Sequence, residues 1–120
     1  MTNKEIFEMC ERPFTPQVTM EQIMSGDCDI KKFISWNIDH RISVLKNEHD
    51  ECVGMIMKMD NSRYDDMVFI TLSWDDTYRI RFVNKNFEIL KDIEGIYCDQ
   101  LYEVIDNTMD SVMKVEFSLN

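Results

Sequence analysis

Four acidic residues near the carboxyl end of the chain recur at the spacing of one helix face. Asp99, Glu103, Asp106 and Asp110 follow one another at intervals of four, three and four residues. Because a helix turns about 100° per residue, these intervals confine the four carboxylates to an arc of about 60°. Neighbouring like charges cost a helix a few tenths of a kcal/mol per pair, so helix stability does not explain the row. Carboxylates at axial steps of about 6 Å can imitate a row of phosphates; the ordinary alternative is a solvated helix face.

The negative charge of the chain is concentrated in the same segment. The sequence has 23 Asp and Glu against 13 Lys and Arg, which gives a formal net charge of −10. Residues 92–120 contain seven acids and one base and so carry −6 of that charge. An acidic field repels nucleic acid and anionic lipid and attracts basic proteins. The sequence therefore disfavours direct binding to nucleic acid or to a membrane, and it predicts a basic protein partner such as a nucleic-acid-binding enzyme.

Two arginines, Arg79 and Arg81, fall on one face of an expected strand. Guanidinium groups bind phosphate through paired hydrogen bonds, so these two residues are candidates for anion binding. The chain is rich in carboxylates, and cross-strand pairing with acids of neighbouring strands is the favoured interpretation.

The remaining residues with metal-binding or nucleophilic side chains lack the spacing of a known centre. The acids between Asp60 and Asp76 do not fit a calcium loop, because Tyr64 and Thr71 stand at the fifth and twelfth positions counted from Asp60. They are interpreted as turn residues. His49 lies near Cys52, but no second pair of ligands at a matching spacing follows. We therefore expect no metal, no cofactor and no enzymatic activity.

The four cysteines are scattered, with no Cys-x-x-Cys pair (Cys10, Cys28, Cys52 and Cys98). Two disulfides stay open, but reduced thiols in a cytoplasm are favoured. No apolar run approaches the ~20 residues of a membrane span, and no export signal is found. The expected location is the cytoplasm, or the host cytoplasm if the gene is viral. The absence of Ala and the abundance of Ile, Asn, Asp, Lys and Met are typical of an AT-rich genome, which hints at a viral or mobile-element origin.

The elements that would position these residues are clearest between residues 52 and 90. Apolar and polar residues alternate there in segments separated by polar turns (53–59, 68–74, 78–82 and 87–90). This pattern predicts an antiparallel β-meander of three to four strands with one buried face.

Helices are expected on both sides of this meander in the sequence. The pairs Thr2–Glu5 and Thr19–Gln22 resemble capping boxes and predict two short N-terminal helices, the second stopping at Gly26. Residues 30–46 fit both a helix and a strand, and a helix over 29–35 followed by extended chain is favoured.

The last expected element is a C-terminal helix over 97–113, which carries an apolar stripe (Leu101, Val104, Ile105, Met109 and Val112). The whole chain, residues 1–120, is thus expected to be a single α+β domain. Its short N-terminal helices and its C-terminal helix would pack on one face of the sheet.

These features favour binding over catalysis. The leading hypothesis is a small acidic protein-binding inhibitor that uses the acidic row on a basic nucleic-acid-handling protein. It would be a nucleic-acid mimic of the anti-restriction or anti-CRISPR type, carried by a phage or mobile element. Two alternatives stay open: an immunity protein that neutralises a toxin nuclease, and a small-molecule or nucleotide-binding regulator that uses Arg79 and Arg81. The edge strands of the meander also leave a homodimer open.

Overall fold

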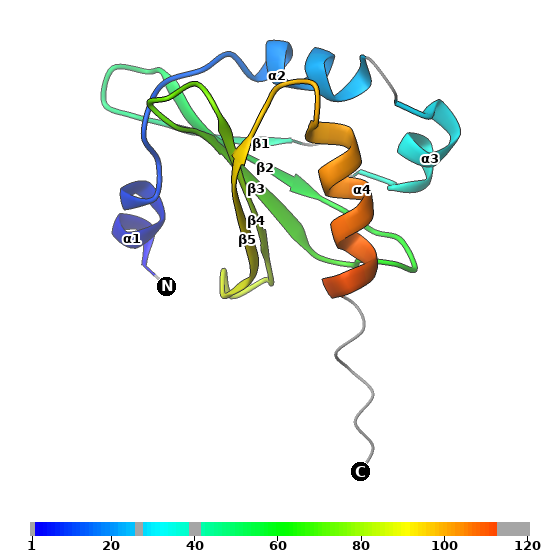
Figure 1. The fold of residues 1–120 in the computed structure, drawn as a ribbon. Coiled ribbons are helices and arrows are strands. Elements are labelled where there is room, and N and C mark those ends of the chain that lie inside the picture. Colours follow the sequence, from blue (N-terminus) through cyan, green and yellow to red (C-terminus); the bar gives the residue numbers. More distant parts are fainter. Residues whose placement is uncertain (1, 26–27, 39–41, 113–120) are drawn as a thin grey trace.

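The computed structural model of the chain describes residues 2–25, 28–38 and 42–112 (Figure 1). Within these residues, five strands form one antiparallel sheet in which each strand pairs with the next along the chain. They are β1 (Ser43–Lys46), β2 (Cys52–Lys58), β3 (Met67–Leu72), β4 (Tyr78–Val83) and β5 (Ile89–Ile96). Four helices accompany them: α1 (Asn3–Glu8), α2 (Pro16–Met24), α3 (Ile30–Ser35) and α4 (Leu101–Val112). The α+β class and the antiparallel meander are confirmed, whereas the expected three to four strands are too few.

The additional strand, β1, comes from residues 30–46, the segment whose sequence fits both the helical and the strand period. Asp29 caps α3 by accepting hydrogen bonds from the backbone N–H groups of Lys31 and Lys32, at 3.0 and 3.3 Å. The favoured expectation of a helix over 29–35 followed by extended chain is confirmed for the helix and for residues 43–46, whereas residues 36 and 37 form a turn and residues 39–41 lie outside the described residues. The extended part includes β1, which pairs with β2 at the edge of the sheet.

Helices α2, α3 and α4 cover one face of the sheet, and the main core lies beneath them (Figure 1). Strand residues on this face are fully buried against the apolar stripe of α4 (Met55, Met57, Ile70, Ile80 and Phe82 against Leu101, Ile105 and Met109). Burial of each such side chain contributes about 1.5–3 kcal/mol. The predicted apolar stripe therefore anchors α4. The helix begins later than expected, because residues 97–100 form a turn closed by the hydrogen bond from Gln100 N to Tyr97 O.

Helix α1 lies on the opposite face of the sheet. The capping box of Thr2 and Glu5 is confirmed, and Ile6 of this helix packs against a second buried cluster that contains Phe69 and Val83. The expectation that the helices pack on one face is wrong for α1. Phe69 of β3 and Val83 of β4 point to the face opposite the main core, so this face also needs cover.

The second predicted capping box is wrong. Helix α2 begins at Pro16, after the N-cap residue Thr15, and proline is well suited to the first position of a helix. Thr19 therefore lies inside the helix, where it is fully buried and its hydroxyl is 2.8 Å from the hydroxyl of Tyr78. The predicted stop at Gly26 and the end of the predicted C-terminal helix at residue 113 lie outside the described residues.

Successive hairpins place alternate turns at the same end of the sheet. Turns 47–51 and 73–77 and the connection 97–100 lie at one end, uppermost in Figure 1. The loops 59–66 and 84–88 lie at the other end. Among the helices that the structure describes, none has the length and apolar character needed to cross a membrane.

Candidate functional site

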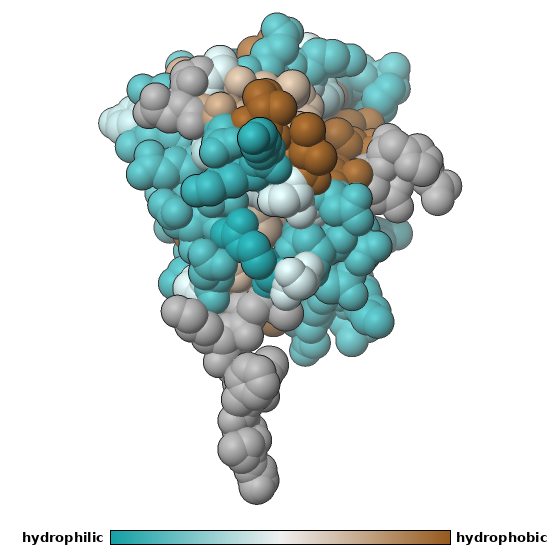
Figure 2. All heavy atoms as spheres, turned by 90° about the vertical axis from the view of Figure 1, so that its right-hand side faces the viewer, coloured by the Kyte–Doolittle hydropathy of each residue, from teal (hydrophilic) through white to brown (hydrophobic). Residues whose placement is uncertain are grey.

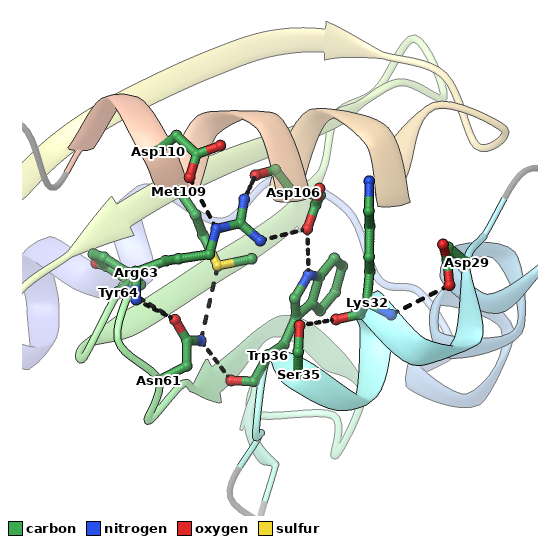
Figure 3. A network of polar contacts seen from close by, with 10 residues as sticks. All are labelled: Asp29, Lys32, Ser35, Trp36, Asn61, Arg63, Tyr64, Asp106, Met109 and Asp110. Atoms are coloured by element: carbon green, nitrogen blue, oxygen red, sulfur yellow. Dashed lines mark hydrogen bonds and ion pairs between the residues drawn. The ribbon is translucent and has the colours of Figure 1, made fainter.

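The predicted acidic row of α4 does not form one exposed face. Asp106 is only 8% exposed, and it accepts hydrogen bonds from Trp36 Nε1 at 2.9 Å and Arg63 Nη1 at 2.8 Å (Figure 3). It lies beside Ile105 and Met109, on the side of the helix that packs against the rest of the molecule. Asp99 precedes the helix, which begins at Leu101. The expectation of four carboxylates on one solvent-facing arc is therefore not met.

Arg63 connects two of the four predicted carboxylates to the loop between β2 and β3. Its Nε donates to Asp110 Oδ1 at 2.9 Å, and its other terminal nitrogen donates to the backbone carbonyl of Asp106. Asn61 holds this loop in place, because its side chain donates to Trp36 O at 2.6 Å and accepts from the backbone N–H of Arg63 at 2.8 Å. The network thus joins α3, the loop and α4, and Asp106 and Asp110 have a structural role in it (Figure 3).

The balance of effects on Asp106 keeps its carboxylate charged. Burial raises the pKa of Asp106, but the hydrogen bonds from Arg63 and Trp36 lower it, and the resulting pKa is below the ordinary value. Trp36 Nε1 and Arg63 Nη1 both donate to Asp106 Oδ1. An ionised, paired carboxylate of this kind is typical of a structural network rather than of a proton-transfer site.

The other two predicted carboxylates face solvent. Asp99 lies in the turn 97–100, and Glu103 lies in the first turn of α4, where negative charge is favourable to the helix dipole. Neither takes part in any ion pair found among the described residues. Unlike Asp106 and Asp110, which pair with Arg63, these two carboxylates are therefore not part of the structural network.

Arg79 and Arg81 lie on the α1 face of the sheet, opposite the face that α2, α3 and α4 cover. Arg79 donates Nε and Nη2 to the two carboxylate oxygens of Asp92, at 2.8 and 2.7 Å. The favoured interpretation, cross-strand pairing with carboxylates, is thereby confirmed for Arg79. Arg81 is 3% exposed, and its guanidinium carbon lies 5.8 Å from the ring centre of Phe69. An anion would have to displace Asp92 from Arg79 and enter a closed space at Arg81.

A stronger concentration of unbalanced charge lies in the turns at one end of the sheet. The turns 47–51 and 73–77 and the connection 97–100 contain six acids and no Lys or Arg (Glu48, Asp50, Glu51, Asp75, Asp76 and Asp99). The loops at the opposite end mix acids with Arg63 and Lys85. We call these three turns the acidic end. Two of the six carboxylates pair with bases from outside the turns, Asp50 with Lys46 and Asp76 with Arg12.

Two exposed aromatic residues belong to the same turns. Trp74 is 69% exposed and Tyr97 is 62% exposed. Glu11 adds a further carboxylate, because it accepts a hydrogen bond from the backbone N–H of Trp74 at 3.3 Å. Exposed Trp and Tyr are the residues most enriched among those that dominate the energy of protein interfaces. The acidic end therefore combines a strong negative field with two apolar anchors.

Two cavities open beside the acidic end. One, of about 920 Å³, lies between α2 and strands β1 and β2, and the other, of about 440 Å³, lies beside β4 and Cys98. Residues 13–15 line both and form the wall between them. Neither cavity is lined by Arg79 or Arg81. The pocket expected for a nucleotide-binding regulator, between sheet and helices with these two arginines, is thus neither of these two cavities.

A compact apolar patch is seen on the side of the molecule that Figure 2 shows. The exposed apolar residues of the end of α2 and of α3 are Met24, Ile30 and Ile34, which are 47%, 51% and 68% exposed. Lys31 and Lys32 accompany them on α3. Asp29 caps the same helix, so this side has charges of both signs and lacks the concentrated negative charge of the acidic end.

The cysteines are unpaired and differ in exposure. Cys52 is buried, Cys10 and Cys28 are half-buried, and Cys98 is exposed. Burial raises the pKa of Cys10 to about 11, which leaves its thiol protonated and weakly nucleophilic at neutral pH. Within residues 2–25, 28–38 and 42–112, no three His, Cys, Asp or Glu side chains are grouped so that they could hold a metal ion.

The acidic end was not singled out from the sequence. The sequence pattern predicts turn residues at Asp75 and Asp76 and a strand that reaches Trp74. The site could have been found by counting the turns of the predicted meander, because every second turn of a meander lies at the same end of the sheet. In comparisons with known proteins, the chain matches no family model, no curated protein and no solved structure.

Proposed function

We propose that the chain is a small acidic inhibitor that binds a basic, nucleic-acid-handling protein through the acidic end. The observation that carries the proposal is the clustering of six carboxylates around Trp74 and Tyr97 in three turns without Lys or Arg. A nucleic-acid mimic of the kind carried by phages and mobile elements fits this surface. An immunity protein directed at a toxin nuclease would use the same surface, and the identity of the partner separates the two.

The electrostatic argument favours a protein partner with a nucleic-acid groove. Alternate turns of an antiparallel sheet are about 10 Å apart, since neighbouring strands lie about 4.8 Å apart. The carboxylates of the acidic end therefore form a broad array, and a groove lined with Lys and Arg to hold phosphates would meet several of them together. The exposed aromatic rings supply contact area that charge alone lacks.

The arginines argue against the alternative of a nucleotide-binding regulator. Arg79 is held by both carboxylate oxygens of Asp92, and Arg81 is buried over Phe69. Arg63 is used by Asp106 and Asp110. Arg63 and Arg79 are therefore engaged by carboxylates of the fold, and Arg81 is enclosed, which argues against their use by an exposed nucleotide site.

The test compares two triple variants that each remove three negative charges. The acidic-end variant carries Glu48→Gln, Asp75→Asn and Asp99→Asn, and the control variant carries Glu8→Gln, Asp60→Asn and Glu88→Gln. Both are used in pull-downs from a lysate of the cells in which the protein acts, with circular dichroism to confirm folding. Wild type and control should capture the same basic protein, and the acidic-end variant should capture at least about tenfold less, because rim charges govern association.

Capture by wild type should also weaken as salt rises, since exposed charges are screened over about 8 Å at physiological ionic strength. Equal capture by the two folded variants would show that the position of the charges is irrelevant and would contradict the proposal.

A further inference from the structure

We infer that the groove between α2 and the edge strand β1 receives an extended basic segment of the partner, which adds to the sheet as a strand beside β1. This inference rests on the proposed function, because it names the part of the partner that the acidic end receives.

The groove has an apolar floor and an acidic rim. Its volume is about 920 Å³, and the side chains of Phe14, Met20, Val44 and Met55 line it. Its charged lining residues are three acids and one base (Glu21, Asp50, Glu51 and Lys46). A segment that carries an apolar side chain next to Lys or Arg is complementary to this lining.

The charges stand on both walls of the groove. Glu21 belongs to α2, whereas Asp50 and Glu51 belong to the turn that follows β1. Lys46 lies 3.3 Å from Asp50 and so neutralises one of the three carboxylates. The net charge of the rim is therefore negative on each side of the groove, and a basic segment lying between the walls would meet carboxylates from both.

Strand β1 supplies the backbone edge that such a segment needs. The sheet order begins at β1, so within residues 2–25, 28–38 and 42–112 only one side of this strand pairs in the sheet. Ser43, Val44 and Lys46 are exposed. An unpaired strand edge offers a row of N–H and C=O groups to an added strand. The opposite edge is less regular, because β5 has two irregularities in its pairing with β4 and a left-handed residue at Gly95.

Cross-strand pairing shows which side chains of β1 face the groove. Val44 is opposite Met55, a member of the main core, whereas Ser43 is opposite Ile56, which packs against the cluster on the α1 face. Residues directly opposite one another share a face of the sheet. Val44 and Ser43 are therefore neighbours on one strand that point to opposite faces, and they provide a matched pair for a test.

The first measurement selects ligands from a displayed library of random ten-residue peptides, with the full-length wild-type protein as the target. Enriched peptides should contain Lys or Arg together with apolar residues at every second position, because side chains alternate along a strand. One synthetic peptide from this set is then titrated into ¹⁵N-labelled protein. The largest amide shifts should fall on residues 43–46 and on the facing residues of α2.

The second measurement compares Val44→Lys with Ser43→Lys. Both variants place the same charge on the same exposed edge strand, where lysine is tolerated. Val44→Lys puts a cation into the groove and should weaken binding of the selected peptide at least about tenfold, while Ser43→Lys should leave it nearly unchanged.

Three results would overturn the inference: no enriched peptide, enrichment of acidic peptides, or equal affinities of the two lysine variants. Such a result leaves the proposed function to its own test, because Glu48, Asp75 and Asp99 do not line the groove. If Val44→Lys still captures the basic partner and the acidic-end variant does not, the acidic end binds the partner without the groove. If both variants still capture the partner, the result contradicts both the inference and the proposed function.

Discussion

Asp106 is held in the interior by two donors from separate parts of the chain. Trp36 comes from the end of α3 and Arg63 from the loop between β2 and β3. Trp36 itself is fully buried and stacks on Tyr102, with ring centres 5.4 Å apart. Helical spacing in a sequence gives the angle of a residue around its helix, but not the depth of its side chain or its partners. The acidic row was therefore predictable as an angle and not as a surface.

Replacement of Asp106 should destabilise the protein. Asp106→Ala leaves the buried indole N–H of Trp36 without its acceptor, whereas Arg63 keeps Asp110 and the backbone carbonyl of residue 106. A buried donor left without its acceptor typically costs about 1–3 kcal/mol. Urea unfolding should show a free energy of unfolding lower by about that amount. Glu103→Ala, on the exposed side of the same helix, is the control and should change it by about 0.5 kcal/mol or less. Equal effects would contradict the structural role of Asp106.

The lowered pKa of Asp106 also predicts how stability depends on pH. A carboxylate whose pKa is lower in the folded than in the unfolded state stabilises the fold at pH values above its unfolded pKa, near 4. This contribution is lost as the pH falls toward the lower folded-state pKa. Melting temperatures of wild type should therefore decrease below about pH 4. Asp106→Asn cannot titrate, so its curve should be flatter in this range; parallel curves would show that Asp106 makes no such contribution.

Gly54 shows how strand β2 accommodates α1 on the far face of the sheet. A methyl group at Gly54 would lie 2.8 Å from a ring carbon of Phe69 and 3.3 Å from Cys10 Sγ. The close approach of these groups requires a residue without a side chain in the middle of the strand.

Gly54→Ala should therefore destabilise the protein by about 1–3 kcal/mol, the usual cost of overpacking a core. The measurement is a double-mutant cycle in urea with Phe69→Leu, which removes the ring that the methyl group meets. The double variant should be more stable than the sum of the single effects predicts. Strict additivity would show that the ring of Phe69 is not the obstacle.

Element prediction from the sequence succeeded where one signal was dominant. The alternation in residues 53–59 and 68–72 and the stripe of Ile105 and Met109 correspond to elements of the structure. It failed where two signals competed. Thr19 resembles a cap, but Pro16 sets the start of α2 and Thr19 is drawn into the core. The short strand β1 is stabilised by its pairing with β2, and this pairing cannot be predicted from the local sequence of β1.

At the scale of the whole molecule, the acidic end is a product of topology. Each of its turns looks like ordinary turn chemistry in the sequence, and Asp75 indeed accepts hydrogen bonds from the backbone and hydroxyl of Thr77. The turns become one surface only because hairpins return the chain to the same end of the sheet. With five strands, three such segments meet there. The predicted meander of three to four strands lacks β1, and the turn 47–51 is therefore missing from the predicted end of the sheet.

The central claim is that a basic partner binds at the acidic end. Hydrogen–deuterium exchange of the protein alone and with the captured partner tests it directly. The claim predicts slower exchange in residues 47–51, 73–77 and 97–100, and unchanged exchange in the loops 59–66 and 84–88 at the opposite end. Protection of those opposite loops, or of α3 alone, would contradict it.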